Sequence, residues 1–303
     1  MVANPRSQGG AGRRRLAALE ARVRDGLGDL EIEWTRGPRD AERIAREAVR
    51  SGVERIVVAG GDGTISEVVT GLLAADLGRY AELAFLPLGT GGDLPRTFGI
   101  PKDVDGALGV IRAGKTRRVD AGRVVFRRPD GGEATTYFLN IASIGITGLI
   151  TRLVNEAPKL LGGRLSFLIG AVRGVLRYAQ PPVRLAVDGE TVHEGPLTLA
   201  TAANGRYFGG GMQCAPRALP DDGLLDVVVV PSYSRLRLLG ELPRIYRGTH
   251  LEVPGVELHR GRVVEAEAPA APVWIEVDGE PLGTLPARFE ILPAAVTVVG
   301  GAD

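Results

Sequence analysis

Hydrophobic positions in the first third of the chain alternate between short unbroken runs and helical spacing. Residues 56–59 and 83–86 are apolar runs followed by glycines, as expected for strands buried on both faces. Between them, apolar side chains recur at helical intervals, at Ile65, Val68, Val69, Leu72 and Leu73. Residues 13–24 and 40–50 predict further helices, and residues 32–34 a short strand. Strands alternating with helices predict a parallel sheet with flanking helices.

From about residue 117 the pattern changes to short strands with two helical stretches. Strands are predicted at residues 123–126, 137–141, 184–187, 197–202, 225–230, 263–267, 273–277 and 296–299. Asp-Gly pairs at residues 130, 188 and 278 separate several of them, as in hairpins. Helices are expected near residues 164–178 and 234–246. We therefore predict an α/β domain over residues 1–116 and a mainly antiparallel β-sandwich-type domain over residues 117–303. The last strand could return to either domain.

Composition narrows the classes of function. The formal net charge of the 303 residues is +1, which predicts no nucleic-acid partner. A single cysteine, Cys214, excludes an intramolecular disulfide and predicts a reducing, cytoplasmic setting. The chain has no signal-peptide core and no apolar run long enough to span a bilayer, so at most we expect a peripheral position at the inner membrane surface. A homodimer is compatible with the sequence.

Glycine-rich turns follow three of the predicted strands, at residues 4–12, 60–64 and 89–93. The second lies between a buried strand and a helix, which directs unpaired backbone N–H groups and the positive end of a helix dipole toward an anion. Ligands bind at the carboxyl ends of strands in parallel sheets. Three such turns together predict a phosphate-binding edge, whereas tight turns alone are the alternative interpretation.

Residues 109–116 satisfy the Walker A pattern but in the wrong context. That pattern binds phosphate only between a strand and a following helix. Here the preceding residues have helical spacing and the following residues lead into a strand. We therefore interpret Gly114 as the residue that ends a helix, with Lys115 as a favourable cation near its C-terminus.

The glycine-rich turns belong to a longer series of motifs, at residues 4–12, 60–64, 88–96, 204–212, 216–226 and 277–281. In this order they resemble the catalytic domain of the diacylglycerol kinase and sphingosine kinase superfamily, in particular its soluble bacterial lipid kinases. Residues 60–64 read Gly-Gly-Asp-Gly-Thr, the signature of that superfamily. The resemblance implies an NAD-kinase-like fold and transfer of the γ-phosphate of ATP to a hydroxyl of a membrane lipid. Diacylglycerol is the leading acceptor, and Mg²⁺ the expected cofactor.

The resemblance also implies roles for individual residues. Contacts with the nucleotide are expected from Asn4, Ser7, Thr35, Gly60, Gly61, Asp62, Gly63, Thr64, Glu67, Gly89, Thr90 and Asp93. Asp62 and Asp93 are the expected carboxylates around the catalytic Mg²⁺, although both could instead cap the helices that follow them. A second, structural Mg²⁺ would bind at Leu219, Asp222 and Leu224.

A carboxylate should accept the proton of the lipid hydroxyl, and we assign this role to Asp278, with Glu280 beside it. The same three letters, Asp-Gly-Glu, also occur at residues 188–190. Both copies fit a plain hairpin turn. Only the resemblance of the flanking residues, through Pro281, favours Asp278.

Two departures from the superfamily pattern affect the nucleotide side: Gly92 stands where the superfamily has asparagine, and Thr70 where it often has asparagine. Two rival functions stay open, an NAD-kinase-like phosphotransferase and a non-catalytic nucleotide or lipid sensor. Arginines along the two helical stretches, Arg173, Arg177, Arg235, Arg237, Arg244 and Arg247, fit either a membrane-facing surface or the solvated edge of core helices.

Overall fold

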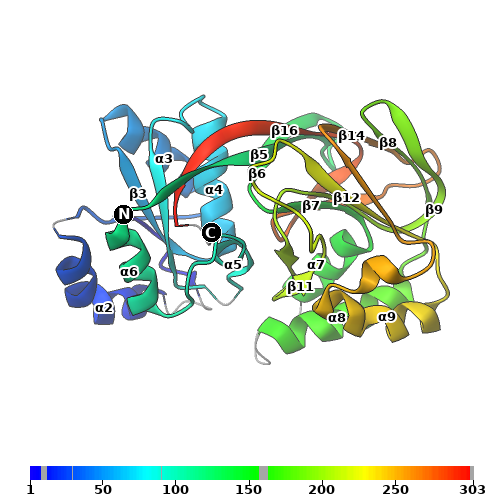
Figure 1. Ribbon diagram of the computed structural model, residues 1–303, viewed down its shortest axis with the longest axis horizontal. Coiled ribbons are helices and arrows are strands. Elements are labelled where there is room, and N and C mark those ends of the chain that lie inside the picture. Colours follow the sequence, from blue (N-terminus) through cyan, green and yellow to red (C-terminus); the bar gives the residue numbers. More distant parts are fainter. Residues whose placement is uncertain (8–11, 29, 90, 157–162, 301–303) are drawn as a thin grey trace. The chain divides into compact units, whose positions relative to one another are not determined.

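The computed structural model of the protein describes residues 1–7, 12–28, 30–89, 91–156 and 163–300; for residues 155–156 and 163–167 it describes the backbone alone (Figure 1). The chain forms two compact units. Unit 1 comprises Met1–Asp120 and Ala294–Asp303, and unit 2 comprises Ala121–Pro293. Two strands continue from one unit into the other, β5 (Thr116–Arg127) and β16 (Glu280–Val299). The last strand therefore ends in unit 1, where Thr297 pairs with Glu82.

Unit 1 contains a parallel sheet in the order β16-β4-β3-β1-β2. Its other strands are β1 (Val2–Ala3), β2 (Glu33–Trp34), β3 (Arg55–Gly60) and β4 (Glu82–Pro87). The helices are α2 (Gly12–Leu27), α3 (Asp40–Arg50), α4 (Asp62–Leu73), α5 (Asp93–Thr97) and α6 (Val104–Ala113). Helix α3 packs against α4, and α2 against α6 (Figure 1). The predicted α/β fold is confirmed.

The end of α6 confirms that residues 109–116 are not a phosphate-binding loop. The Asp103 side chain accepts a hydrogen bond from the Gly106 N–H at the start of the helix. Gly114 ends it in a left-handed conformation, with φ of 64°. Strand β5 then begins at Thr116, so the motif runs from helix to strand, opposite to the order that a phosphate-binding loop requires.

Unit 2 is an antiparallel sandwich, as predicted. Its strands, besides parts of β5 and β16, are β6 (Glu133–Phe138), β7 (Ile141–Gly145), β8 (Pro182–Val187), β9 (Glu190–Ala203), β10 (Tyr207–Phe208), β11 (Met212–Gln213), β12 (Leu225–Pro231), β13 (Glu257–Gly261), β14 (Val263–Glu267) and β15 (Trp274–Val277). One layer has the order β13-β12-β9-β7-β15-β16. The other is formed by β9, β8, β14, β16, β5 and β6, so the long strands β9 and β16 take part in both.

Alternation along the strands gives unit 2 two cores. On β7, Ala142 and Ile144 face the interior of the sandwich. Their neighbour Ile141 lies in a second core, which is completed by helices. These helices are α7 (Ile146–Glu156), α8 (Gly163–Arg177) and α9 (Arg235–Arg247), with the 3₁₀ helix η2 (His250–Glu252). One face of the sheet therefore packs on the other layer and the opposite face on helices.

Two predictions for unit 2 were wrong in detail. Residues 137–141 are not one strand: β6 ends at Phe138 and β7 begins at Ile141. The turn between them matters for the site, because backbone N–H groups of residues 139–141 donate to the Asp278 carboxylate. Helix α7 was missed because its apolar residues directly continue the buried strand β7, which hides the change of period.

Candidate active site

The carboxyl ends of the parallel strands bring the predicted nucleotide residues together in unit 1. The Asn4 N–H donates to the Ala59 carbonyl over 3.1 Å, and the Thr35 N–H donates to the Ala3 carbonyl over 2.9 Å. The Leu88 N–H likewise donates to the Gly60 carbonyl over 3.0 Å. The turns after β1, β2, β3 and β4 therefore share one edge of the sheet, as the sequence predicts.

The turn at residues 60–64 has the geometry of an anion site. Gly61 is the extended residue before α4, and the helix begins at Asp62. The Asn4 amide donates to the Thr64 hydroxyl over 3.0 Å and thus joins the first turn to the second. A Cβ on Gly60 would lie 2.7 Å from the Thr64 Oγ1, so only glycine fits there. A phosphate could accept hydrogen bonds from the first N–H groups of α4.

Asp62 connects the second turn to the third. Its Oδ2 accepts hydrogen bonds from the N–H groups of Gly92 and Asp93 over 3.0 and 3.2 Å, and its Oδ1 accepts from Leu94 over 3.3 Å. The carboxylate therefore caps α5 from a different helix. Burial, and secondly the negative charge of Asp93, raise the pKa of Asp62, while these backbone donors oppose the rise.

The backbones of the two turns touch. A Cβ on Gly89 would lie 2.4 Å from the Gly61 Cα, and a Cβ on Gly91 would lie 2.7 Å from the Asp62 Oδ2. Gly92 has φ of 75°, a left-handed conformation that glycine and asparagine tolerate better than other residues. Glycine at position 92 is therefore compatible with the backbone conformation of this turn. Thr90 lies outside the described residues.

Two of the remaining predicted residues of unit 1, Asp93 and Glu67, have structural partners. Asp93 is 6% exposed and forms an ion pair of 2.6 Å with Arg96. The Glu67 carboxylate accepts from the Ala41 N–H over 3.3 Å at the start of α3, and burial raises its pKa. Ser7 and Thr35 are buried, and Gly63 is exposed. Sequence reasoning missed Lys102, whose Cε lies 3.9 Å from the Cβ position of Gly92 and brings a cation to the third turn.

The acidic hairpin of unit 2 joins β15 to β16. Asp278 and Gly279 both have positive φ, of 46° and 92°, which is the pattern of a two-residue hairpin turn. The Asp278 carboxylate accepts from the N–H groups of Leu139, Asn140 and Ile141 over 3.3, 3.2 and 3.0 Å. The turn between β6 and β7 thus fixes the side chain that the sequence assigned as the base.

Two buried asparagines form hydrogen bonds that hold the turn contacting this hairpin. The Asn204 amide donates to the Leu139 carbonyl over 2.8 Å, and the Asn140 amide donates to the Tyr207 carbonyl over 2.5 Å. The motif that begins at Asn204 therefore positions the turn that holds Asp278.

Glu276 is the acidic residue that sequence reasoning missed. It is 3% exposed, and one carboxylate oxygen accepts from the Ser143 hydroxyl over 2.6 Å while the other accepts from the Gly279 N–H. Burial raises its pKa to about 7, and the charge of Glu280 adds to the rise, while the two donors oppose it. The signal was a glutamate inside a predicted strand, two residues before the aspartate.

The residues assigned to a second Mg²⁺ lie beside an arginine, and the assignment stays a prediction. The Arg260 guanidinium pairs with Asp222 and, over 2.8 Å, with the buried Asp226. The Leu224 N–H donates to Asp222 over 3.1 Å, and Leu219 is exposed. A guanidinium thus occupies the position of a cation between these carboxylates. In the part of the chain that the structure describes, no three His, Cys, Asp or Glu side chains converge as metal ligands.

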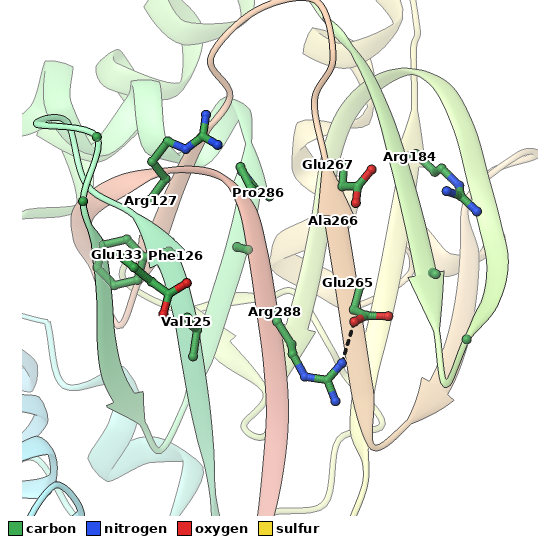
Figure 2. A pocket seen from close by; sticks show the side chains of 15 residues that line it. Val125, Phe126, Arg127, Glu133, Arg184, Glu265, Ala266, Glu267, Pro286 and Arg288 are labelled. Atoms are coloured by element: carbon green, nitrogen blue, oxygen red, sulfur yellow. Dashed lines mark hydrogen bonds and ion pairs between the residues drawn. The ribbon is translucent and has the colours of Figure 1, made fainter.

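A pocket of about 590 Å³ lies elsewhere, on the outer face of the sandwich (Figure 2). Arg127, Arg184 and Arg288 line it together with Glu133, Glu265 and Glu267, and Arg288 pairs with Glu265 over 2.5 Å (Figure 2). These charges sum to zero, so the pocket has no net positive charge that would attract a nucleotide. It contains none of the predicted site residues, and we do not assign the chemistry to it.

Known proteins give this arrangement its context. Residues 1–124 match the diacylglycerol kinase catalytic domain, and residues 140–300 match the YegS C-terminal NAD kinase beta sandwich-like domain. The chain belongs to the diacylglycerol kinase/YegS family of lipid kinases. The family prediction is confirmed, and a kinase of this family uses a nucleotide as a substrate.

Individual relatives of this lipid kinase agree. A diacylglycerol kinase of Mycobacterium tuberculosis is 33% identical over 261 residues, which is 86% of this chain and 81% of the relative. A probable lipid kinase, YegS-like, of Enterobacter is 32% identical over 93% of this chain and 89% of its own length.

Solved structures of other proteins have a similar fold to this chain. A putative diacylglycerol kinase from Bacillus anthracis has a TM-score of 0.77 and 26% identity, with 99% of this chain and 96% of that chain covered. Yeast NADH kinase has a TM-score of 0.52 at 12% identity, over 96% of this chain and 80% of that chain. The fold is thus NAD-kinase-like, as predicted.

Proposed function

We propose that this lipid kinase transfers the γ-phosphate of ATP to the hydroxyl of diacylglycerol. The observation that carries the proposal is the carboxylate of Asp278, held by three backbone donors in a family of lipid kinases. The acceptor is suggested by the Mycobacterium tuberculosis relative, whose name specifies diacylglycerol and which is 33% identical.

The nucleotide would bind at the sheet edge of unit 1. Its phosphates would accept hydrogen bonds from the first N–H groups of α4 and from the turn around Gly61 and Gly89. Asn4, Ser7 and Thr35 would contact the rest of the nucleotide. Because Asp62 fixes the third turn against the second, these donors need little reorganisation when the anion arrives.

Two carboxylates fit a magnesium ion that arrives with the nucleotide. Asp62 and Asp93 are close enough for the charge of one to raise the pKa of the other, and a divalent cation relieves such repulsion. Mg²⁺ commonly takes only one or two protein carboxylates and completes its shell with phosphate oxygens and water. The ion would neutralise charge on the transferred phosphoryl group.

Asp278 would act on the acceptor. As the lipid oxygen forms its bond to the γ-phosphorus, the hydroxyl proton passes to the Asp278 carboxylate and the bond from the γ-phosphorus to ADP breaks. The backbone donors from residues 139–141 keep that carboxylate oriented. Glu280 would stand beside it, at the first position of β16 directly after the turn.

A transfer assay with labelled ATP and Mg²⁺ tests the proposal. Mixed micelles would each contain one acceptor: diacylglycerol, phosphatidylglycerol, ceramide or sphingosine, and a micelle-free reaction would contain NAD. We expect label in diacylglycerol. Label in NAD alone would favour the NAD-kinase-like alternative. ATP binding without transfer to any acceptor would favour a nucleotide sensor.

A further inference from the structure

Helix α8 packs on its neighbour through small residues. A Cβ on Gly170 would lie 2.4 Å from a methyl carbon of Val154, and a Cβ on Gly174 would lie 2.5 Å from the Ile150 Cγ1. These glycines let α8 lie close against α7, and the adjoining Ala171 and Val175 are buried with them. Three other apolar residues of α8, Leu168, Val172 and Leu176, are therefore not part of this buried contact.

Those larger residues form a stripe that points outward. Leu168 is 41% exposed and Leu176 is 50% exposed, and Val172 lies between them at helical spacing, partly exposed. The sequence left open whether the apolar residues of this helix were core or surface, and the structure places the leucines at the surface. Beside α8 lies α9, on which no residue is buried and Leu236 is 83% exposed (Figure 1).

Exposed arginines lie on the same two helices as these leucines. Arg173 and Arg177 lie on α8, and Arg235 and Arg247 lie on α9. The one acidic residue of α9, Glu241, is already paired with Arg244 over 2.9 Å. Within the described part of the chain, no carboxylate pairs with any of these four arginines. The surface is thus apolar and cationic at once.

We infer that this α8–α9 surface is where the protein lies on an anionic membrane, an inference that rests on the proposed lipid acceptor for its purpose. We define the surface by Leu168, Val172, Arg173, Leu176, Arg177, Arg235, Leu236 and Arg247. Its leucines enter the apolar boundary of the bilayer, and its arginines contact lipid phosphates. A second copy of this chain is a poorer occupant, because a two-fold contact would bring like charges together.

Vesicle co-sedimentation tests the surface without requiring catalysis. The probes are vesicles of phosphatidylcholine alone and of phosphatidylcholine with about one-third phosphatidylglycerol. We expect wild-type protein to sediment with the anionic vesicles and to be released by salt, because each arginine contributes about fivefold to binding at a strongly anionic surface. Absence of sedimentation with anionic vesicles would overturn the inference.

Two groups of variants separate the contribution of the leucines to membrane binding from that of the arginines. Leu168→Gln with Leu176→Gln, and separately Arg173→Gln with Arg177→Gln, should each weaken anionic-vesicle binding at least tenfold. The matched control, Arg127→Gln with Arg184→Gln in the pocket of Figure 2, removes exposed arginines of the same unit and should bind as wild type. Equal loss in the control would reduce the effect to net charge and contradict the inference.

A soluble acceptor separates this inference from the proposed function. With a short-chain diacylglycerol present as monomers, the surface variants should phosphorylate at the wild-type rate while losing activity on vesicles. If wild type binds anionic vesicles but phosphorylates no monomeric acceptor, the proposed function fails and the surface stands. A wild-type dimer that the leucine variant converts to a monomer without lipid would assign the surface to a second copy instead.

Discussion

The two Asp-Gly-Glu hairpins of unit 2 have nearly the same local structure. Asp188 and Asp278 have φ of 48° and 46°, and the glycine that follows has φ of 86° or 92°. Asp188 accepts from the N–H groups of Arg262 and Val263 over 2.9 and 2.8 Å, as Asp278 accepts from residues 139–141. Even the backbone N–H of each aspartate donates to a carbonyl of the segment that it caps.

What lies around the hairpins differs. Asp278 caps a turn that the buried Asn204 also holds, and Glu276 lies beneath it. The position that matches Glu276 in the other hairpin is Ala186, which lines the open, charge-balanced pocket together with Gly189. The same three residues therefore have only a structural role at the surface in one place and, in our proposal, carry the base in the other. In this proposal the surroundings of the hairpin, and not its sequence motif, determine which aspartate acts as the base.

The largest expected difference between the hairpins is catalytic. Asp278→Asn should lower the rate of phosphate transfer about a hundredfold or more, because it removes the proton acceptor. Asp188→Asn, the matched control, replaces a carboxylate with the same capping geometry and should stay within about threefold of wild type. The measurement is initial rate at saturating ATP and acceptor, with thermal unfolding to confirm that both variants fold.

Equal rates of phosphate transfer for the two variants would show that the two hairpins do not differ in their catalytic role. If both variants lost activity together with stability, both hairpins would have a purely structural role and the base would lie elsewhere.

The second difference is the pH dependence of stability caused by Glu276. Its pKa is raised from 4.5 to about 7, so the folded protein holds a proton that the unfolded chain releases. That contribution is fully present below pH 4.5 and is lost as the pH rises through about 7, a span of about 3 kcal/mol. Glu276→Gln should flatten this slope in urea titrations between those limits.

The control for this prediction is Asp188→Asn, which leaves the buried glutamate in place and should keep the slope of the wild type. A slope that Glu276→Gln leaves unchanged would show that the carboxyl is ionised in the folded protein throughout.

The third prediction concerns what the hairpins share. Gly279→Ala and Gly189→Ala both place a side chain at positive φ, and no described atom lies within 4 Å of either new Cβ. Each should cost about 1–2 kcal/mol of unfolding free energy through the backbone alone. Chemical denaturation would measure both. Costs that differ by more than about 1 kcal/mol would mean that the turns are not equivalent.

The smallest expected effect comes from rewriting the surface hairpin. Ala186→Glu makes residues 186–190 read like residues 276–280. Because Ala186 faces an open pocket, stability should change by no more than about 0.5 kcal/mol. In the Asp278→Asn background it should restore no phosphate transfer. Measurable rescue would show that the five-residue sequence is sufficient and that its surroundings are not needed.

Much of unit 1 could be predicted from the sequence because its signals are local. Residues 40–50 and the turn at Gly61 have the spacing and the glycines that their structures require. The false phosphate-binding loop could be rejected because the order of strand and helix is visible in the apolar pattern.

The features that escaped prediction depend on contacts distant in sequence. The exposure of Leu168 and Leu176 follows from glycines on α8 that meet α7, and the burial of Glu276 follows from its contact with Ser143 on a neighbouring strand. The pairing of Asp222 with Arg260, from another strand, likewise has no local signal. Periodicity gives the faces of an element but not which face another element covers.

The most direct test of the account compares ATP binding and turnover in Asp278→Asn. We have assigned nucleotide binding to unit 1 and proton acceptance to Asp278. We predict that calorimetry will find an ATP dissociation constant within about twofold of wild type while phosphate transfer to diacylglycerol falls about a hundredfold or more. Loss of ATP binding in parallel with turnover, or wild-type turnover in the variant, would contradict it.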